Sequence, residues 1–101
     1  MIGRVRVLVY YAADGDGDAL VGAYERVNKE MDGTPGLVGA ELLESTLDVG
    51  RFVVLSEWDD LPSFQRWEEG TRHRNQTSEL RPYEDSSRGR AYGIYQVIGQ
   101  L

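Results

Sequence analysis

The sequence contains no cysteine and only one histidine in 101 residues. Without cysteine there is no disulfide bridge, thiolate metal site or cysteine nucleophile, and this composition is consistent with a reducing compartment. One histidine cannot build a conventional zinc site, and the chain carries no glycine-rich phosphate loop, serine-centred nucleophile elbow or HExxH motif. We therefore expect a function that requires neither a metal nor a cofactor.

Long apolar segments and an excess of positive charge are also absent. The apolar run near the N-terminus is too short for a signal peptide or a membrane span, so we expect a cytoplasmic protein with no membrane partner. Eleven basic residues against 17 acidic ones give a net charge of -6, which argues against nucleic acid as a partner. Ten of the eleven basic residues are arginine, which suits binding of carboxylates or phenolates.

What the chain does contain is a single domain, residues 1–101, in which strand and helix patterns alternate. β-Branched and aromatic residues predict strands, and apolar residues spaced i, i+4, i+7 and i+11 from Leu20 predict an amphipathic helix. Pro62 suits the first turn of a second helix, with Asp60 as its cap, and Gly70 interrupts it. The predicted strands are 4–11, 37–45, 51–58 and 90–97, and the predicted helices are 18–32 and one that begins near Leu61.

This order of elements is that of an α+β domain with a ferredoxin-like βαββαβ arrangement, in which the helices cover one face of an antiparallel sheet. The last strand carries large apolar residues on both of its faces, where Tyr92, Ile94 and Ile98 alternate with Tyr95, Val97 and Leu101. The helices can bury only one face of the sheet. We therefore expect a homodimer in which two sheets pack against each other.

Three segments and the histidine follow one another in a characteristic order: PGLVGAELL at 35–43, RFVVLSEW at 51–58, SFQRW at 63–67, and His73. Their order and spacing resemble the antibiotic biosynthesis monooxygenase family of dimeric α+β barrels, and the resemblance covers nearly the whole chain. It implies a pocket between sheet and helices in each subunit. It also implies oxidation of polycyclic aromatic polyketides by molecular oxygen without flavin, haem or metal.

Trp67 and His73 are the candidate catalytic residues. The Trp67 indole shares one side of the second helix with Phe64, where it can serve as core or as the wall of a pocket. His73 is the only imidazole available as a base, and the charges of Arg72 and Arg74 would favour its neutral form if they lay close. The simpler alternative for His73 is a half-exposed residue that closes the turn after the helix.

The candidate substrate-binding residues are Tyr10, Phe64, Arg72, Gln76 and Tyr95. Aromatic rings can stack on a flat substrate, and tyrosine hydroxyls can hydrogen-bond to it. Gln76 would share a helical face with the histidine three residues earlier. Tyrosines on strands are equally consistent with plain cross-strand packing.

Two other activities fit the sequence poorly. Haem-degrading oxygenases of the same superfamily resemble this chain at Trp67, but the first strand offers no asparagine, and Thr77 stands where their histidine should follow. The acidic segment 14–18 partly copies a calcium loop, but Ala19 replaces the glycine required at the sixth position. Asp18 as the cap of the first helix explains the same residues.

We therefore expect a cofactor-independent monooxygenase that oxidises an aromatic polyketide of the anthrone or hydroquinone type in secondary-metabolite biosynthesis. Its expected partners are a small aromatic substrate, molecular oxygen and a second copy of the chain. Two alternatives stay open, since a fold does not fix a function. One is a polyketide cyclase or aromatase, which would turn over without consuming oxygen, and the other is a small-molecule-binding dimer without chemistry.

Overall fold

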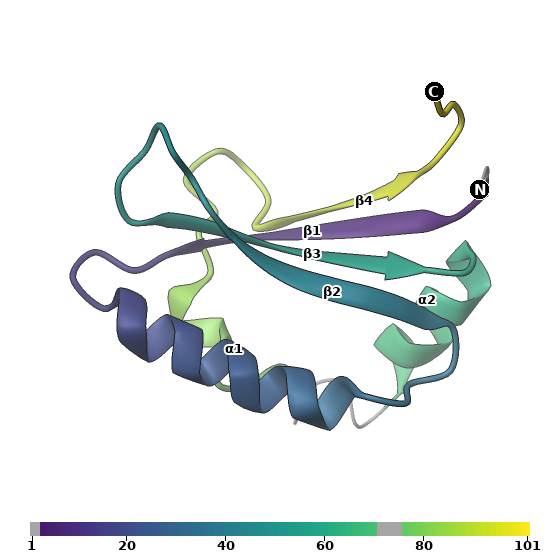
Figure 1. The fold of residues 1–101 in the computed structure, drawn as a ribbon, viewed down its shortest axis with the longest axis horizontal. Helices are drawn as coiled ribbons and strands as arrows, with labels where there is room; N and C mark the ends of the chain where they lie inside the picture. Colours follow the sequence, from purple (N-terminus) through teal and green to yellow (C-terminus); the bar gives the residue numbers. More distant parts are fainter. Residues whose placement is uncertain (1–2, 71–75) are drawn as a thin grey trace.

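A computed structural model describes residues 3–70 and 76–101, and it confirms the ferredoxin-like α+β arrangement (Figure 1). The four strands are β1 (Val5–Ala12), β2 (Leu37–Glu44), β3 (Arg51–Trp58) and β4 (Tyr92–Gln96). The helices are α1 (Gly17–Met31), α2 (Leu61–Glu69) and the short 3-10 helix η1 (Arg81–Tyr83). The strand order in the sheet is β2-β3-β1-β4, and every neighbouring pair is antiparallel.

The strand register sets which side chains share a face of the sheet. Val5 in β1 lies opposite Trp58 in β3, and this pairing continues along all eight residues of both strands. On the other side of β1, Val5 also lies opposite Gln96 in β4. β2 and β3 form the predicted hairpin, with a register shift at Val38. The first and last strands of the domain are therefore neighbours.

Helix α1 follows the predicted stripe, because Leu20, Val27 and Met31 are all buried against the sheet. It starts one residue earlier than expected, at Gly17. The expectation that Asp18 caps the helix was wrong, since this residue lies inside the first turn. Its carboxylate is still close to the positive end of the helix dipole, which it stabilises without a capping bond.

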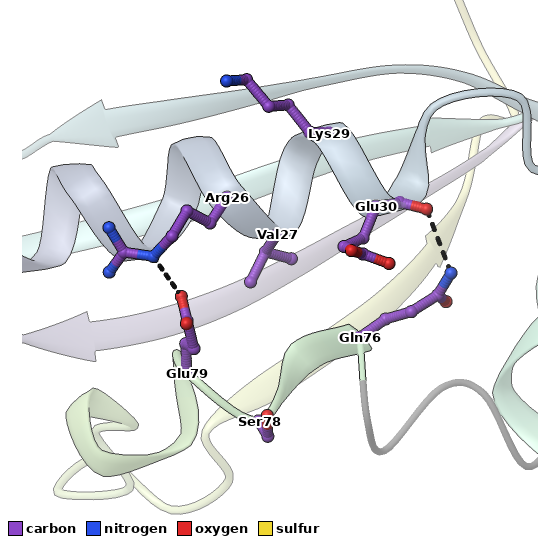
Figure 2. Close-up of a pocket in the computed structure, with 7 residues that line it drawn as sticks. All are labelled: Arg26, Val27, Lys29, Glu30, Gln76, Ser78 and Glu79. Atoms are coloured by element: carbon purple, nitrogen blue, oxygen red, sulfur yellow. Dashed lines mark hydrogen bonds and ion pairs between the residues drawn. The ribbon is translucent and has the colours of Figure 1, made fainter.

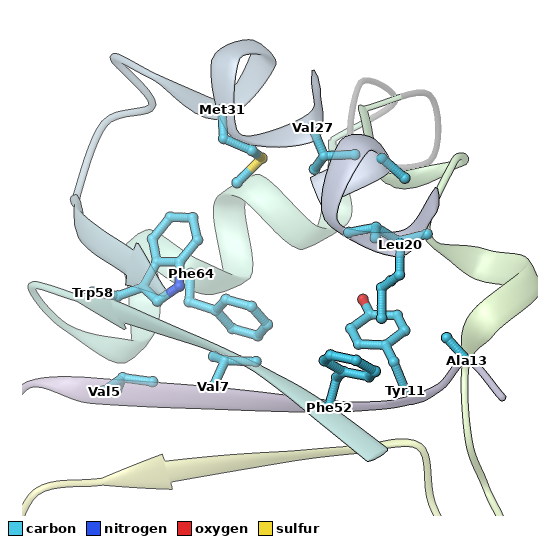
Figure 3. Close-up of a cluster of buried hydrophobic side chains, with 12 residues drawn as sticks. Val5, Val7, Tyr11, Ala13, Leu20, Val27, Met31, Phe52, Trp58 and Phe64 are labelled. Atoms are coloured by element: carbon cyan, nitrogen blue, oxygen red, sulfur yellow. The ribbon is translucent and has the colours of Figure 1, made fainter. Parts of the chain in front are cut away.

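The core fills the layer between the sheet and the two helices, as Figure 3 shows. Trp58, Leu20 and Val5 are its largest fully buried side chains. Its remaining buried hydrophobic residues are Val7, Tyr11, Ala13, Ala23, Val27, Met31, Phe52, Phe64 and Leu80. β1 and β3 contribute alternate residues to this layer, as the period of two in a strand requires.

Both helices lie on one side of the sheet, and within residues 3–70 and 76–101 no helix covers the other side (Figure 1). We call this other side the open face. Its apolar residues come from all four strands: Leu8, Tyr10, Leu43, Val53, Leu55 and Tyr95. At one end of the open face Glu57 accepts from Arg4 at 2.6 Å and pairs with Arg6 at 3.5 Å. No helix among the described residues is long and apolar enough to cross a membrane.

Candidate functional site

Three aromatic side chains meet where α2 packs on the sheet, and we call Trp58, Phe64 and Trp67 the aromatic cluster. The Trp58 ring centroid lies 5.4 Å from that of Phe64 in an edge arrangement and 5.3 Å from that of Trp67. Trp58 is fully buried, whereas Trp67 is half-buried. Trp67 is therefore the member of the cluster that a ligand can reach.

The start of α2 is held in place by two local features. Asp60 accepts a hydrogen bond from the Ser63 backbone N–H at 2.8 Å, as the sequence predicted, and hydrogen bonds from Ser63 lower the pKa of the Asp60 carboxyl. The loop before β2 approaches the helix at Gly36, whose φ of 85° suits glycine, and a Cβ there would collide with the Ser63 side chain. These contacts fix the position from which Trp67 projects.

Both indole N–H groups of the aromatic cluster have acceptors. Trp58 donates to Ser56 Oγ at 3.0 Å, on the same face of β3. Trp67 donates to Gln76 Oε1 at 2.9 Å, and the Gln76 amide in turn donates to the Glu30 backbone carbonyl at 3.1 Å. Gln76 thus joins α2 to the last turn of α1. Gln76 was predicted to bind substrate, but no local pattern in the sequence signals this bridge, because Gln76 and Glu30 are 46 positions apart.

An open groove of about 620 Å³ lies beside Gln76, between α1 and residues 76–79 (Figure 2). Its lining residues are Arg26, Val27, Lys29, Glu30, Gln76, Ser78 and Glu79. Arg26 Nε and Glu79 Oε2 form an ion pair across it at 2.7 Å, and both side chains are largely exposed, so this pair adds little stability. The buried Val27 supplies an apolar contact within a mostly charged rim.

Tyr10 and Tyr95, two of the predicted substrate-binding residues, lie on the open face. The Tyr95 ring folds over Gly93, where a Cβ would come within 2.6 Å of it, and its hydroxyl lies beside that of Tyr10. Burial and the neighbouring Tyr95 raise the pKa of Tyr10. The sheet separates this tyrosine pair from Phe64, Trp67 and Gln76. The structure therefore divides the predicted site into two groups on opposite faces.

Tyr11 is a tyrosine that sequence analysis did not select. Its side chain is only 5% exposed and points into the core toward α1 (Figure 3). Burial raises the pKa of Tyr11 strongly, Glu84 raises it further and Arg81 opposes the change. The phenol is therefore neutral over the physiological pH range. Strand alternation distinguishes Tyr11 from Tyr10, but the sequence alone does not say which of the two faces the helices.

Arg72 and His73 lie outside the described residues, so their predicted roles stay predictions. Phe64 is buried in the core beneath α2, and its ring centroid lies 6.0 Å from that of Trp67. Among residues 3–70 and 76–101, no group of three or more histidine, cysteine, aspartate or glutamate side chains is arranged to hold a metal ion.

The sheet order, the helix layer and the aromatic cluster define a small α+β protein whose candidate site lies between helix and sheet. The chain belongs to the antibiotic biosynthesis monooxygenase family, since residues 4–76 match that family. Protein SchA from Streptomyces halstedii is 28% identical to it over 98 residues. That alignment covers 96% of this chain but only 26% of SchA, so the chain spans about a quarter of that relative's length.

Solved structures share the whole fold at low sequence identity. A point variant of SnoaB, a cofactor-independent oxygenase from Streptomyces nogalater, superposes with a TM-score of 0.81 at 17% identity, covering 98% of this chain and 97% of SnoaB. A conserved protein from Methanosarcina mazei Go1 superposes with a TM-score of 0.77 at 13% identity, covering 95% of this chain and 94% of that one. At these identities the likeness establishes the fold.

Proposed function

We propose that this protein is a cofactor-independent monooxygenase that oxidises an aromatic polyketide of the anthrone or hydroquinone type with molecular oxygen. The observation that carries the proposal is the half-buried Trp67, held against Trp58 and Phe64 in a chain of the monooxygenase family. A flat aromatic substrate would stack on such a surface. The fold shared with the oxygenase SnoaB supports the same reaction class.

The proposed reaction needs no redox group from the protein, because the substrate supplies the electrons. A phenolic anthrone loses a proton, and its electron-rich anion transfers one electron to oxygen. The resulting radical pair combines into a carbon-bound peroxide anion. This anion takes back the proton that the substrate first released, and the hydroperoxide so formed loses water to leave a ketone. One oxygen atom enters the product and the other leaves as water, so atoms and electrons balance. The protein has to bind the substrate, accept the first proton and exclude water.

Four of the predicted site residues would divide these tasks. Trp67, with the buried Phe64 packed behind it, would hold the ring system, His73 would accept the proton, and Arg72 would stabilise the phenolate. The tyrosine pair on the open face cannot contact this ligand within one chain, because the sheet lies between them. We assign Tyr10 and Tyr95 instead to the proposed contact between subunits.

The test is oxygen consumption by the purified, chelator-treated protein supplied with an anthrone, after subtraction of the spontaneous rate. A general base typically contributes 10²–10⁴-fold, so His73→Ala should lower turnover by roughly 100-fold or more. Trp67→Phe should also lower it, while Gln65→Leu on the exposed side of α2 should not. Binding without oxygen uptake above the spontaneous rate would refute the proposal and favour a cyclase or a binding protein.

We propose further that the open face packs against the same face of a second copy. Leu43 is 42% exposed and Tyr95 is 55% exposed, and they flank the half-buried Leu8, Val53 and Leu55. Apolar surface of this kind on all four strands is typical of an interface. A two-fold axis would let each sheet cover the other without any additional element.

A further inference from the structure

We propose that Gln76 is a positioning residue that sets the orientation of the Trp67 indole, and that it does so by tying Trp67 to the C-terminal turn of α1. This inference rests on the proposed function, in which Trp67 holds the substrate. It differs from the substrate-binding role predicted for Gln76, because it gives the amide two partners within the protein. The two hydrogen bonds measure 2.9 Å to the indole and 3.1 Å to the Glu30 carbonyl.

The chemistry of the two partners fixes the orientation of the Gln76 amide. An indole N–H can only donate and a backbone carbonyl can only accept, whereas a glutamine amide offers one acceptor and one donor group. The bridge is therefore satisfied only when Oε1 faces Trp67 and Nε2 faces Glu30. An amide turned the other way would set donor against donor and acceptor against acceptor. Both polar groups of the Gln76 side chain are therefore used in hydrogen bonds within the protein.

The bridge supplies a hydrogen-bond donor to a backbone carbonyl in the last turn of α1. The last carbonyls of a helix lack partners within the helix. In α1, the Asn28 carbonyl accepts from the Asp32 N–H, and the Met31 carbonyl accepts from the backbone and side chain of Thr34. The Glu30 carbonyl accepts from Gln76, as Figure 2 shows. The bridge therefore anchors Trp67 to the last turn of a helix whose inner face, through Val27 and Met31, is buried in the core.

The hydrogen bond matters because contacts between aromatic rings orient the Trp67 indole less strictly. The rings of Trp58 and Phe64 lie at tilted angles of 35° and 47° to it, and aromatic contacts of this kind are weakly directional. A hydrogen bond at the indole nitrogen defines the direction of the ring edge. A substrate stacked on Trp67 would be oriented by the direction of the indole ring. Misalignment of the substrate lowers the rate of reaction more than the binding affinity.

The test uses the two tryptophans as probe and internal control. In a ¹⁵N–¹H spectrum the chain shows two indole N–H signals, which Trp67→Phe assigns by removing one. Gln76→Leu should shift the Trp67 signal and speed its hydrogen exchange by about tenfold, the change expected for loss of one hydrogen bond. The Trp58 signal should stay in place, because its acceptor is Ser56. Gln76→Glu keeps an acceptor for the indole but has no N–H for the Glu30 carbonyl, so the Trp67 N–H should still exchange slowly while its signal moves from the original position.

Kinetics then separate positioning from substrate contact. Gln76→Leu should lower kcat by about tenfold with KM within about twofold of the original, and Gln65→Leu should change neither. Gln76→Glu should not recover the lost kcat, because it cannot donate to the Glu30 carbonyl and so lacks the tie to α1. An unchanged Trp67 signal in Gln76→Leu, or a raised KM with kcat intact, would overturn the proposal. If the unmodified protein consumes no oxygen, the proposed function fails, while the indole signals still decide whether Gln76 orients Trp67.

Discussion

Replacing Gly36 with alanine tests whether the loop before β2 fixes the position of α2. Gly36 has a φ of 85°, and a Cβ built there would collide with Ser63 Cβ and lie 2.6 Å from Ser63 Oγ. Gly33 is a matched control, because its φ is 83° and nothing lies within 4 Å of its Cβ position. The two positions share the backbone strain and differ only in what the new methyl group meets.

The expected magnitudes follow from that difference. Alanine in the left-handed region costs about 1–2 kcal/mol, which both variants should lose. Forcing a methyl group against a packed neighbour adds about 1–3 kcal/mol, which only Gly36→Ala should lose. Gly36→Ala should therefore lower the free energy of unfolding by about 2–5 kcal/mol, and Gly33→Ala by about 1–2 kcal/mol.

Urea unfolding at one fixed protein concentration measures both losses. Adding Ser63→Gly to Gly36→Ala removes the clashing Cβ and Oγ, so the double variant should be more stable than the sum of the two single changes implies. Equal losses for the two alanine variants, with no coupling to Ser63, would refute the claim that this contact holds α2 in place.

The remaining predictions concern the interface and two ionisable groups. Leu55→Arg should convert the proposed dimer into a monomer, because it would bury a charge between the two open faces. Size-exclusion chromatography with light scattering measures the mass, and a dimer of unchanged mass would contradict the proposed contact. Burial raises the pKa of Tyr11 above 10.0, so the protein should lose stability as pH rises beyond about 10. Urea midpoints measured at pH 7 and pH 10.5 should show this loss, and the loss should be smaller in Tyr11→Phe. The pKa of Asp60 is lowered, so its capping bond should stabilise the protein at neutral pH and less as pH falls through the folded-state pKa. Asp60→Ala should therefore lower Tm more at pH 7 than at pH 3. Equal decreases in Tm at the two pH values would contradict the stabilising role of the ionised carboxylate.

Local patterns predicted most of the fold. The spacing of Leu20, Val27 and Met31 gave α1, and the pairing of Asp60 with Pro62 gave the start of α2, because each signal lies within a short stretch of the chain. Every strand boundary was predicted to within two residues. The capping role was wrongly assigned to Asp18 because three aspartates alternate with two glycines over residues 14–18, and several of them could begin a helix.

The candidate site was harder to predict, since it depends on contacts between distant segments. Alternation along β1 separates Tyr10 from its neighbours, but the face on which it lies is set by the pairing of β1 with β3. Tyr95 was therefore grouped with Trp67 although the sheet stands between them. No periodic pattern in the sequence predicts the hydrogen bond from Gln76 to α1, because it depends on the position of residue 76 in the folded chain.

The position of β1 in the middle of the sheet affects the order in which this domain can be made. β1 is synthesised first, yet one of its two neighbours is β4, whose residues 92–96 are the last of the sheet to appear. The local β2–β3 hairpin can form early, whereas the β1–β4 pairing must wait for nearly the whole domain to be translated. Until then, the nascent chain carries an unpaired strand edge rich in valine, a segment suited to contacts with chaperones or with other nascent chains.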